Sequence, residues 1–419
     1  MIKTVSFSKP LTGTITIPAD KSVSHRAVMF SSIANGKSII KNFSSGADCH
    51  STLNLFKQLG IKSEFLDEKT LWVEGGNLTG SNSVLDCGNS GTTMRLVSGI
   101  LAGQNFNSVL IGDVSLSKRP MKRIIEPLTL MGAEITAADG HAPLAIKGCP
   151  LHGIKYISPI ASAQVKSAIL LAGLRAEGKT TFNEPYVSRD HTERLLKYLG
   201  AEIQGTTIYP SELTARDIDI VGDISSAAFF IVAGLIIKDS NFIIKNVGIN
   251  PTRTGILDII KRMGGWINIL NERNVSGEPC ADIRVQYTES LKGCVIEGSD
   301  IPRLIDELPV IAVLASQAEG EAIIKDAGDL RNKESDRITC LVKELQKIGV
   351  NIEERPDGFV VRKSDLTGNA ELECYHDHRL AMSFYIAGLI SKKEIAINGF
   401  EWTKISFPEF EELINSLYN

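Results

Sequence analysis

The sequence lacks the features that mark membrane, secreted and nucleotide-binding proteins. Its longest apolar stretch, residues 227–237, is too short to span a bilayer. The first residues, MIKTVSFSKPL, contain no long apolar run, so we expect no signal peptide. The seven cysteines are scattered without a C-x-x-C pair, which is typical of reduced, buried thiols in a cytoplasmic protein. No G-x-x-x-x-G-K-[ST] segment is present, which excludes the nucleotide P-loop.

The chain also lacks an excess of basic residues. Among 419 residues, 45 are Lys or Arg and 49 are Asp or Glu, which gives a formal net charge of −4. This balance argues against a nucleic-acid-binding protein, although it permits a local basic pocket. The contents of 43% apolar and 22% charged residues are ordinary for a soluble globular protein, and the length predicts two domains.

What the sequence does contain is a repeated pattern. Amphipathic segments end in an apolar residue and a glycine at five places: Leu59-Gly60, Met131-Gly132, Leu199-Gly200, Met263-Gly264 and Ile348-Gly349. A sixth copy runs from His378 to near Leu417. A repeat of this length is a folding unit, so the fold should be assembled from copies.

The first copy predicts the order helix, strand, helix, strand, strand, with one more strand before them. The expected segments are residues 14–17, 22–34, 38–43, 48–59, 61–65 and 70–74. We expect Gly36 at the C-terminus of the first helix, where a left-handed residue is cheap, and Asp48 as the N-cap of the second.

Six copies predict two similar α/β domains, each of three βαβαββ repeats. Equivalent first helices are expected near Ser90, Ser162, Ser225, Glu307 and His378, and second helices near Arg119, Arg189, Pro251, Glu334 and Ser406. One domain should comprise residues 20–221 and the other residues 1–19 with 222–419, with hinges near 18–20 and 221–223. The N-terminal strand, residues 2–7, has no helix of its own and is expected to pair with the second domain.

Cations recur at the predicted helix starts. The set comprises Lys21, Arg119, Arg189, Lys333 and Arg379. Each cluster alone has an ordinary interpretation as a cap or a solvated face, but random surface charge would not follow the repeat. Helix N-termini and guanidinium groups both bind anions. We therefore expect helix N-termini to face an interdomain cleft that holds a multiply anionic small molecule.

Two further segments, one acidic and one rich in histidine, have alternative interpretations. Asp306 and Glu307 stand at the start of an apolar helix, where they complement the dipole or supply a catalytic base. His376 and His378 flank an aspartate, but residues two apart face different sides of a helix, so we predict no metal site there.

In chain order, the segments PADKSVSHR, GNSGTTMR, KRPM, SAQVKSA, SRDHTE, DELPV, KESDR and DHRLAM resemble the 5-enolpyruvylshikimate-3-phosphate synthase family, from Thr14 to Phe410. PADKSVSHR and SRDHTE are similar to its class II bacterial branch. The resemblance implies the enolpyruvyl transferase fold, with two domains of three βαβαββ units. It also implies transfer of the enolpyruvyl group of phosphoenolpyruvate to the 5-hydroxyl of shikimate 3-phosphate, by addition–elimination with release of phosphate, in the route to chorismate and the aromatic amino acids.

The resemblance further implies roles for individual residues. Asp306 would take the proton of the attacking hydroxyl, and either Lys21 or Glu334 would protonate the methylene carbon. The implied phosphoenolpyruvate-binding residues are Lys21, Asn89, Gly91, Arg119, Gln164, Arg337, Arg379 and Lys404. The implied shikimate-3-phosphate-binding residues are Lys21, Ser22, Arg26, Ser162, Ala163, Gln164, Arg189, Asp306 and Lys333.

The sequence departs from the family pattern at two places. Ile405 precedes Ser406-Phe407-Pro408 where the family often has lysine, and Lys404 stands one residue earlier. Ser162-Ala163 replaces a pair of serines. The resemblance implies no metal and no organic cofactor. It implies a cytoplasmic monomer without nucleic-acid or membrane partners, and glyphosate as a candidate inhibitor.

Three other assignments compete with this resemblance. The sister transferase that acts on UDP-N-acetylglucosamine carries a catalytic cysteine in a mobile loop, and residues 114–120 contain none. RNA-terminal cyclases share a related repeat, but the charge of −4 argues against RNA. A noncatalytic phosphometabolite-binding protein would not need the acids and bases that are present here, and a turnover measurement would separate it from an enzyme.

Overall fold

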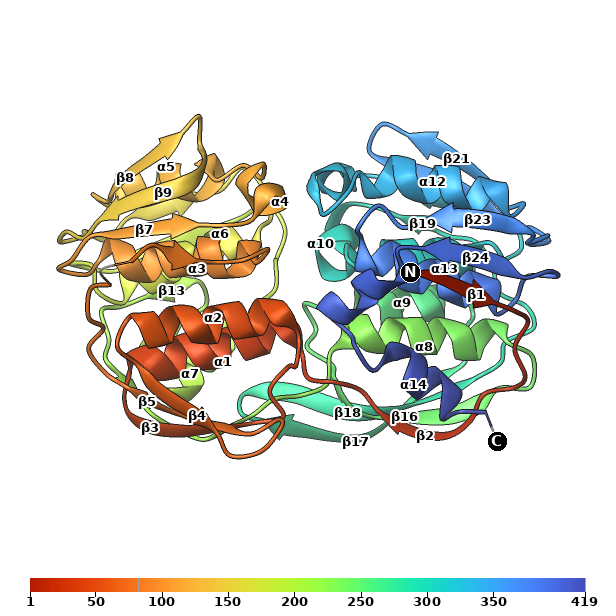
Figure 1. Ribbon diagram of the computed structural model, residues 1–419, viewed down its shortest axis with the longest axis horizontal. Helices are drawn as coiled ribbons and strands as arrows, with labels where there is room; N and C mark the ends of the chain where they lie inside the picture. The colour runs from red at the N-terminus through yellow and green to blue at the C-terminus, as the bar shows by residue number, and fades with distance from the viewer. Residues whose placement is uncertain (82, 419) are drawn as a thin grey trace. The chain divides into compact units, whose positions relative to one another are not determined.

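The computed structural model describes residues 1–81 and 83–418 and divides the chain into two compact units (Figure 1). The discontinuous unit comprises Met1–Pro18, Gly222–Arg273 and Pro279–Asn419. The inserted unit comprises Ala19–Val221 and Asn274–Glu278. Within the described residues, each unit contains three sheets.

Residues 274–278 were expected with the second half of the chain, but they lie in the inserted unit. Two contacts explain the difference. The backbone N–H of Asp219 donates to Ser276 Oγ at 2.9 Å, and His191 Nδ1 lies 2.8 Å from Glu278 Oε1. The tip of one hairpin is therefore held by side chains and backbone of the inserted unit.

The inserted unit contains three repeats in chain order. Its helices are α1 (Lys21–Ile33), α2 (Ala47–Gln58), α3 (Gly91–Ala102), α4 (Val114–Ser117), α5 (Lys122–Leu130), α6 (Ala163–Gly173) and α7 (His191–Tyr198). Its strands are β3 (Ala34–Lys41), β4 (Lys62–Phe65), β5 (Leu71–Gly75), β6 (Leu85–Asp86), β7 (Ser108–Ile111), β8 (Glu134–Ala138), β9 (His141–Lys147), β10 (Lys155–Ile157), β11 (Thr180–Asn183), β12 (Ile203–Gln204), β13 (Thr207–Ile208), β14 (Leu213–Thr214) and β15 (Ile218–Asp219). The sheet orders are β14-β3-β5-β4, with β15 also on β3, then β6-β7-β9-β8 and β10-β11-β13-β12.

The discontinuous unit has the same plan. Its helices are α8 (Ile224–Ile236), α9 (Gly255–Arg262), α10 (Ile301–Leu304), α11 (Leu308–Ala315), α12 (Arg337–Lys347), α13 (His378–Gly388) and α14 (Phe410–Asn415), with 3-10 turns η1 (Gly298–Asp300), η2 (Gly328–Asn332) and η3 (Phe400–Ile405). Its strands are β1 (Ile2–Val5), β2 (Thr12–Thr16), β16 (Asn241–Gly248), β17 (Ile267–Val275), β18 (Glu278–Gln286), β19 (Val295–Ile296), β20 (Glu321–Ile324), β21 (Asn351–Arg355), β22 (Gly358–Arg362), β23 (Ala370–Glu373) and β24 (Ile395–Asn398). The sheet orders are β17-β18-β16-β2, β19-β20-β22-β21 and β1-β24-β23.

The two N-terminal strands complete sheets whose other members come much later in the chain. β1 pairs antiparallel with β24, so the expected pairing of the N-terminal strand with the second half of the chain is confirmed. β2 pairs in parallel with β16, so the prediction that residues 14–17 lead the first repeat is wrong. In the first repeat β14 and β15 occupy that place, because they pair in parallel with β3.

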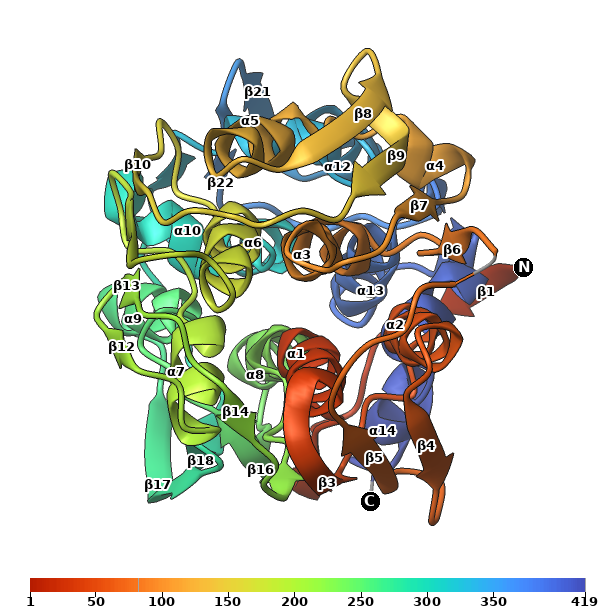
Figure 2. The ribbon, with the colours of Figure 1, turned by 90° about the vertical axis from the view of Figure 1, so that its left-hand side faces the viewer.

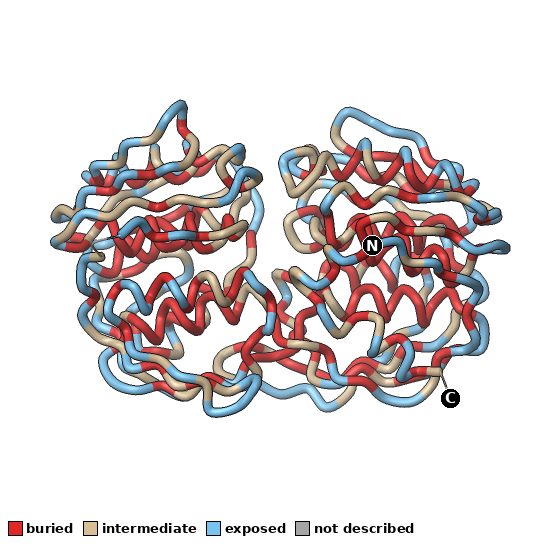
Figure 3. The backbone as a smooth tube through the Cα atoms, viewed as in Figure 1, coloured by how far each residue is buried: buried red, intermediate tan, exposed pale blue. Residues whose placement is uncertain are grey.

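The first helix of each repeat is largely buried, as the red helical segments of Figure 3 show. In α8, every residue from Ala227 to Ala233 is at most 1% exposed. Small residues let these helices approach closely. A Cβ added at Gly99 of α3 would lie 2.1 Å from the carbonyl oxygen of Ala168 on α6, and Figure 2 shows the two helices side by side. The cores therefore hold the starts of the buried helices in fixed positions.

Several local predictions are wrong in instructive ways. α1 ends at Ile33 and runs directly into β3, so Gly36 lies in a strand with φ +116°. The N-cap of α2 is Gly46, and Asp48 lies in the first helical turn. The second helices also begin later than expected, with α5 at Lys122, α9 at Gly255, α12 at Arg337 and α14 at Phe410. For α5 the reason is the short helix α4, which occupies part of the loop before it.

The cysteines are all free, but only four of them are buried: Cys49, Cys87, Cys280 and Cys374. Cys149, Cys294 and Cys340 are half-buried, which corrects the expectation that the thiols are buried throughout. Among the described residues, no helix combines the length and apolar character needed to cross a membrane.

Candidate functional site

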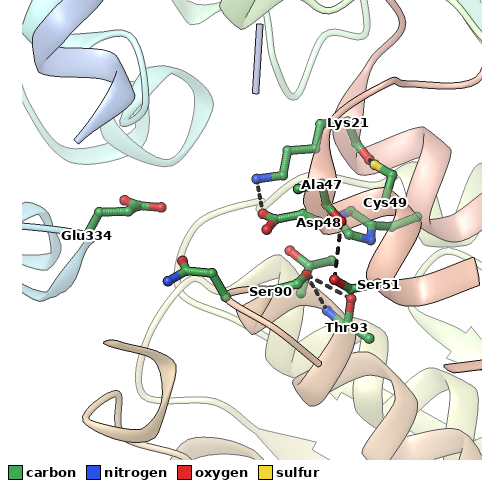
Figure 4. Close-up of polar contacts among 12 residues, drawn as sticks. Lys21, Ala47, Asp48, Cys49, Ser51, Ser90, Thr93 and Glu334 are labelled. Atoms are coloured by element: carbon green, nitrogen blue, oxygen red, sulfur yellow. Dashed lines mark hydrogen bonds and ion pairs between the residues drawn. The ribbon is translucent and has the colours of Figure 1, made fainter. Parts of the chain in front are cut away.

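Lys21 is the first residue of α1 and forms an ion pair with Asp48 of α2 (Figure 4). The N-cap of α1 is Asp20, whose carboxylate accepts the backbone N–H of Val23 at 2.8 Å. The cap fixes the helix start, and the partner carboxylate orients the ammonium group of Lys21. The expected placement of Lys21 at a helix start is confirmed, whereas the role of Asp48 was missed because its carboxylate was interpreted as a cap.

Asn89 lies in the turn between β6 and α3 and links two charged residues. Its Nδ2 donates to Asp113 Oδ2 at 2.6 Å, and its Oδ1 accepts from Arg119 Nη2 at 2.9 Å. Arg119 itself lies between α4 and α5 rather than at a helix start, which corrects the prediction. The turn nevertheless brings an amide, a carboxylate and a guanidinium together.

Gln164, in the first turn of α6, connects to the same region. Its Nε2 donates to Thr92 Oγ1 at 3.0 Å, and its Oε1 accepts from Arg95 Nη1 at 2.6 Å. A Cβ added at Gly91 would lie 3.0 Å from Arg95 Nη1. Arg95 is the last residue of the motif GNSGTTMR, but the sequence alone indicated no role for it. Its position one helical turn after Gly91 was the available signal.

Arg26 is buried, and its guanidinium bonds to the protein itself. Nη1 donates to the carbonyl oxygen of Ser22 at 2.9 Å, Nε to Thr192 Oγ1 at 2.7 Å and Nη2 to Ser167 Oγ at 2.9 Å. Burial lowers its pKa to about 10, although neighbouring carboxylates oppose this effect. Arg26 therefore braces Ser22 and ties α1 to α6 and α7.

The loop before α7 carries Arg189, which is half-buried. Ser162 is the N-cap of α6, with Ala163 as the first helical residue. The neighbouring Lys166 is 1% exposed and pairs with Glu184 at 3.2 Å and Glu193 at 2.8 Å. This buried ion-pair group supports the start of α6 and the adjoining loop.

In the discontinuous unit, Arg337 is the centre of an ion-pair network. Its Nε donates to Asp377 Oδ2 at 2.7 Å, Nη2 to Glu334 Oε2 at 2.5 Å, and Nη1 to Asp306 Oδ1 at 3.4 Å. Burial opposes the charge of Arg337, but Asp377, Glu334 and Asp306 outweigh it and raise the pKa. Arg337 is thus a permanent cation held among three carboxylates.

Two further cations face Asp306. Lys333 Nζ lies 3.6 Å from Asp306 Oδ1, and Arg379 Nη1 donates to the carbonyl oxygen of Asp306 at 3.2 Å. The structure therefore groups the predicted residues Asp306, Lys333, Glu334, Arg337 and Arg379. Lys404 lies exposed in η3, and within the described part of the chain its side chain forms no hydrogen bond or ion pair.

Across residues 1–81 and 83–418, no group of three His, Cys, Asp or Glu side chains is placed to hold a metal ion. The polar groups around Asn89 and Gln164 in the inserted unit and around Arg337 in the discontinuous unit consist of cations with carboxylate, amide and hydroxyl partners. Such groups bind anions through charge-assisted hydrogen bonds and transfer protons.

Comparison with known proteins decides the family. The family model for EPSP synthase (3-phosphoshikimate 1-carboxyvinyltransferase) matches residues 5–414. The chain belongs to the EPSP synthase family. It is 50% identical over 423 residues to the 3-phosphoshikimate 1-carboxyvinyltransferase of Geotalea uraniireducens, with 99% of this chain and 98% of the relative covered. It is 51% identical over 417 residues to the enzyme of that name from Bacillus cereus, with 97% of each covered.

Solved structures agree with this identification. The EPSP synthase of Acinetobacter baumannii superposes with a TM-score of 0.88 at 43% identity, covering 99% of this chain and 98% of that one. The enolpyruvyl transferase NikO of Streptomyces tendae has a TM-score of 0.80 at 17% identity, covering 99% and 97%, and shows the fold alone. The EPSP synthase family and the enolpyruvyl transferase fold expected from the sequence are confirmed.

Proposed function

We propose that this EPSP synthase family member transfers the enolpyruvyl group of phosphoenolpyruvate to the 5-hydroxyl of shikimate 3-phosphate and releases phosphate. The observation that carries the proposal is the setting of Asp306, which lies beside Lys333 and Arg337 in a chain that matches the family almost throughout. The two cations orient the Asp306 carboxylate, which can then act as a general base, and their fixed positive charge stabilises anions bound beside them.

The reaction needs a base at the hydroxyl and an acid at carbon. Asp306 would take the proton of the attacking hydroxyl, with Lys333 near the reacting oxygen. The acid that protonates the methylene carbon would be Lys21 or Glu334. Both are already in ion pairs, Lys21 with Asp48 and Glu334 with Arg337, so each has a partner that orients it. In the elimination step the group that protonated the carbon takes a proton back from the new methyl group, and phosphate leaves with the proton that Asp306 took from the hydroxyl, which restores the carbon–carbon double bond.

Anion binding would fall to the cations of both units. Asn89, Arg119 and Gln164 form a connected polar group in the inserted unit, with Gly91 leaving room beside the guanidinium groups. Together with Lys21, Arg337 and Arg379 they would hold phosphoenolpyruvate. Shikimate 3-phosphate would contact Ser22, Ser162, Ala163 and Arg189. Arg26 would support Ser22 through its hydrogen bond to the Ser22 carbonyl oxygen.

We further propose that the protein is a cytoplasmic monomer. Glyphosate, a small phosphonate and carboxylate anion, would compete for the cations that hold phosphoenolpyruvate.

The direct test is phosphate release from phosphoenolpyruvate in chelator-treated buffer, with and without shikimate 3-phosphate. The proposal expects release only when shikimate 3-phosphate is present. Release that requires UDP-N-acetylglucosamine instead would assign the chain to the sister reaction. No release with either acceptor would contradict an enzymatic role.

A further inference from the structure

A buried chain of hydrogen bonds joins three helices of the inserted unit to the turn before α3. His25 Nδ1 on α1 lies 2.6 Å from Thr52 Oγ1 on α2, which lies 2.7 Å from Thr93 Oγ1 on α3. Thr93 Oγ1 donates to Ser90 Oγ, the N-cap of α3, at 2.8 Å (Figure 4). All four residues are at most 1% exposed. We call this group the His25–Ser90 chain.

The hydrogens of the His25–Ser90 chain run in one direction. The Thr93 hydroxyl has a single hydrogen, which it donates to Ser90, so it accepts from Thr52. Thr52 in turn accepts from His25, which requires the tautomer with hydrogen on Nδ1. The alternative acceptor for the Thr52 hydroxyl, the carbonyl oxygen of Asp48, is more distant at 3.4 Å.

The second ring nitrogen of His25, Nε2, takes no part in this hydrogen-bond chain. His25 Nε2 is buried and has no hydrogen-bond partner. The pKa of His25 is lowered to about 3, mainly by burial and also by Lys21 and Arg26, while Asp48 partly opposes these effects. The ring is therefore neutral at working pH, and its hydrogen stays on the nitrogen that Thr52 uses. A side chain needed only to fill the core would not leave a polar atom buried and unpaired.

We propose that His25 is a positioning residue for phosphoenolpyruvate binding, acting through Thr52 and Thr93 on the Ser90 cap. The proposal rests on the proposed function. Asn89 directly precedes the cap, and its Oδ1 holds Arg119. Gly91 directly follows the cap, and a Cβ added there would lie 3.0 Å from Arg95 Nη1 and 3.5 Å from Arg119 Nη1. A shift of the cap would thus move the groups assigned to the phosphoenolpyruvate anions.

Steady-state kinetics with shape-matched variants test this role. Thr52→Val keeps the shape and removes the hydroxyl, and we expect it to raise KM for phosphoenolpyruvate about tenfold, the loss of one buried hydrogen bond. KM for shikimate 3-phosphate and kcat should change less than about threefold. Thr52→Ser restores the hydroxyl and should return KM for phosphoenolpyruvate to within about twofold of the wild-type value.

Ser98→Ala is the matched control for loss of a buried hydroxyl. Ser98 lies on α3, and its hydroxyl donates to the carbonyl oxygen of Met94 in the same helix. This variant should lower the unfolding temperature without changing KM for phosphoenolpyruvate. An unchanged KM in folded Thr52→Val enzyme would overturn the positioning role. A wild-type chain that releases no phosphate with either acceptor would instead contradict the proposed function.

A measurement on the wild-type protein keeps the proposal testable if the Thr52 variants do not fold. Nitrogen-15 NMR of the imidazoles, with His25 assigned by loss of its signals in His25→Gln, distinguishes the two tautomers. We expect hydrogen on Nδ1 and no titration between about pH 5 and pH 8. Hydrogen on Nε2, or a titration midpoint near the ordinary histidine value, would overturn the proposal.

Discussion

Asp377 receives two hydrogen bonds from Arg337, with Nε 2.7 Å from Oδ2 and Nη2 3.3 Å from Oδ1. Both side chains are almost fully buried. Asp377 also accepts from Ser335 Oγ at 3.1 Å and from the backbone N–H of Arg379 at 2.9 Å, where it caps α13. One carboxylate thus joins the starts of α12 and α13 and fixes two of the cations assigned to phosphoenolpyruvate.

Asp377→Asn should destabilise the protein and reduce turnover. It removes the most buried of the three carboxylate charges that compensate Arg337, so the free energy of unfolding should fall by about 3 kcal/mol. Turnover should fall at least about tenfold, because Arg337 and Arg379 lose their common anchor. Urea unfolding and kcat measure the two effects. Asp365→Asn is the control, because Asp365 pairs with Lys392 at an exposed site and should give no measurable change in either.

Lys21→Ala and Asp306→Ala should each keep the fold and lose most turnover. Neither side chain lies in the core, and general acid–base groups contribute about 10²- to 10⁴-fold to rate. Circular dichroism should be unchanged, while kcat falls by a factor in that range. Wild-type rates in both variants would contradict the catalytic assignment.

Gly91→Ala should raise KM for phosphoenolpyruvate about tenfold and leave KM for shikimate 3-phosphate within about twofold. The added Cβ would lie 3.0 Å from Arg95 Nη1 and 3.5 Å from Arg119 Nη1, so at least one guanidinium must move. Gly103→Ala at the other end of α3 is the control, because its Cβ would meet neighbours at 3.4 Å or more. Equal KM values in the two variants would show that the space beside Gly91 is not used.

The buried imidazole of His25 should make stability depend on pH. Its pKa is about 3 in the folded chain and about 6.5 in the unfolded chain, so only the unfolded state takes up a proton between these values. This contribution to the free energy of unfolding is fully present above about pH 6.5 and is lost as pH falls. The loss reaches about 2 kcal/mol at pH 5.

Comparison of urea unfolding at pH 7 and pH 5 measures this dependence. His25→Gln should remove that part of the pH dependence, whatever its effect on stability at pH 7. His152→Gln is the control, since His152 is exposed, and it should keep the wild-type slope. A wild-type slope in His25→Gln would mean that the ring titrates alike in both states.

The sequence predicted features that depend on local order. Asp306, Lys333 and Arg337 stand in short motifs at helix starts, and periodicity placed those starts to within a few residues. The helix starts at the capping residues Ser90 and Ser162 could also be predicted, because a cap and the helix that it begins are adjacent in the chain.

Features that depend on distant partners could not be predicted. β2 looked like the leading strand of the first repeat, because the sequence does not reveal that its partner is β16. Glu278 meets His191 from 87 residues away, with no local pattern to mark it. The Asp48 carboxylate could either cap α2 or form an ion pair, and only the structure shows that it pairs with Lys21.

The pairing of β1 with β24 and of β2 with β16 affects how the protein is made. These strands are synthesised first, yet their partners, residues 395–398 and 241–248, emerge only after the whole segment 19–221. Domains generally fold as units during synthesis. The inserted unit can therefore fold before the partner strands of the first eighteen residues have been synthesised. Truncation or a tag at the N-terminus should therefore harm the C-terminal half of the chain more than the segment that directly follows it.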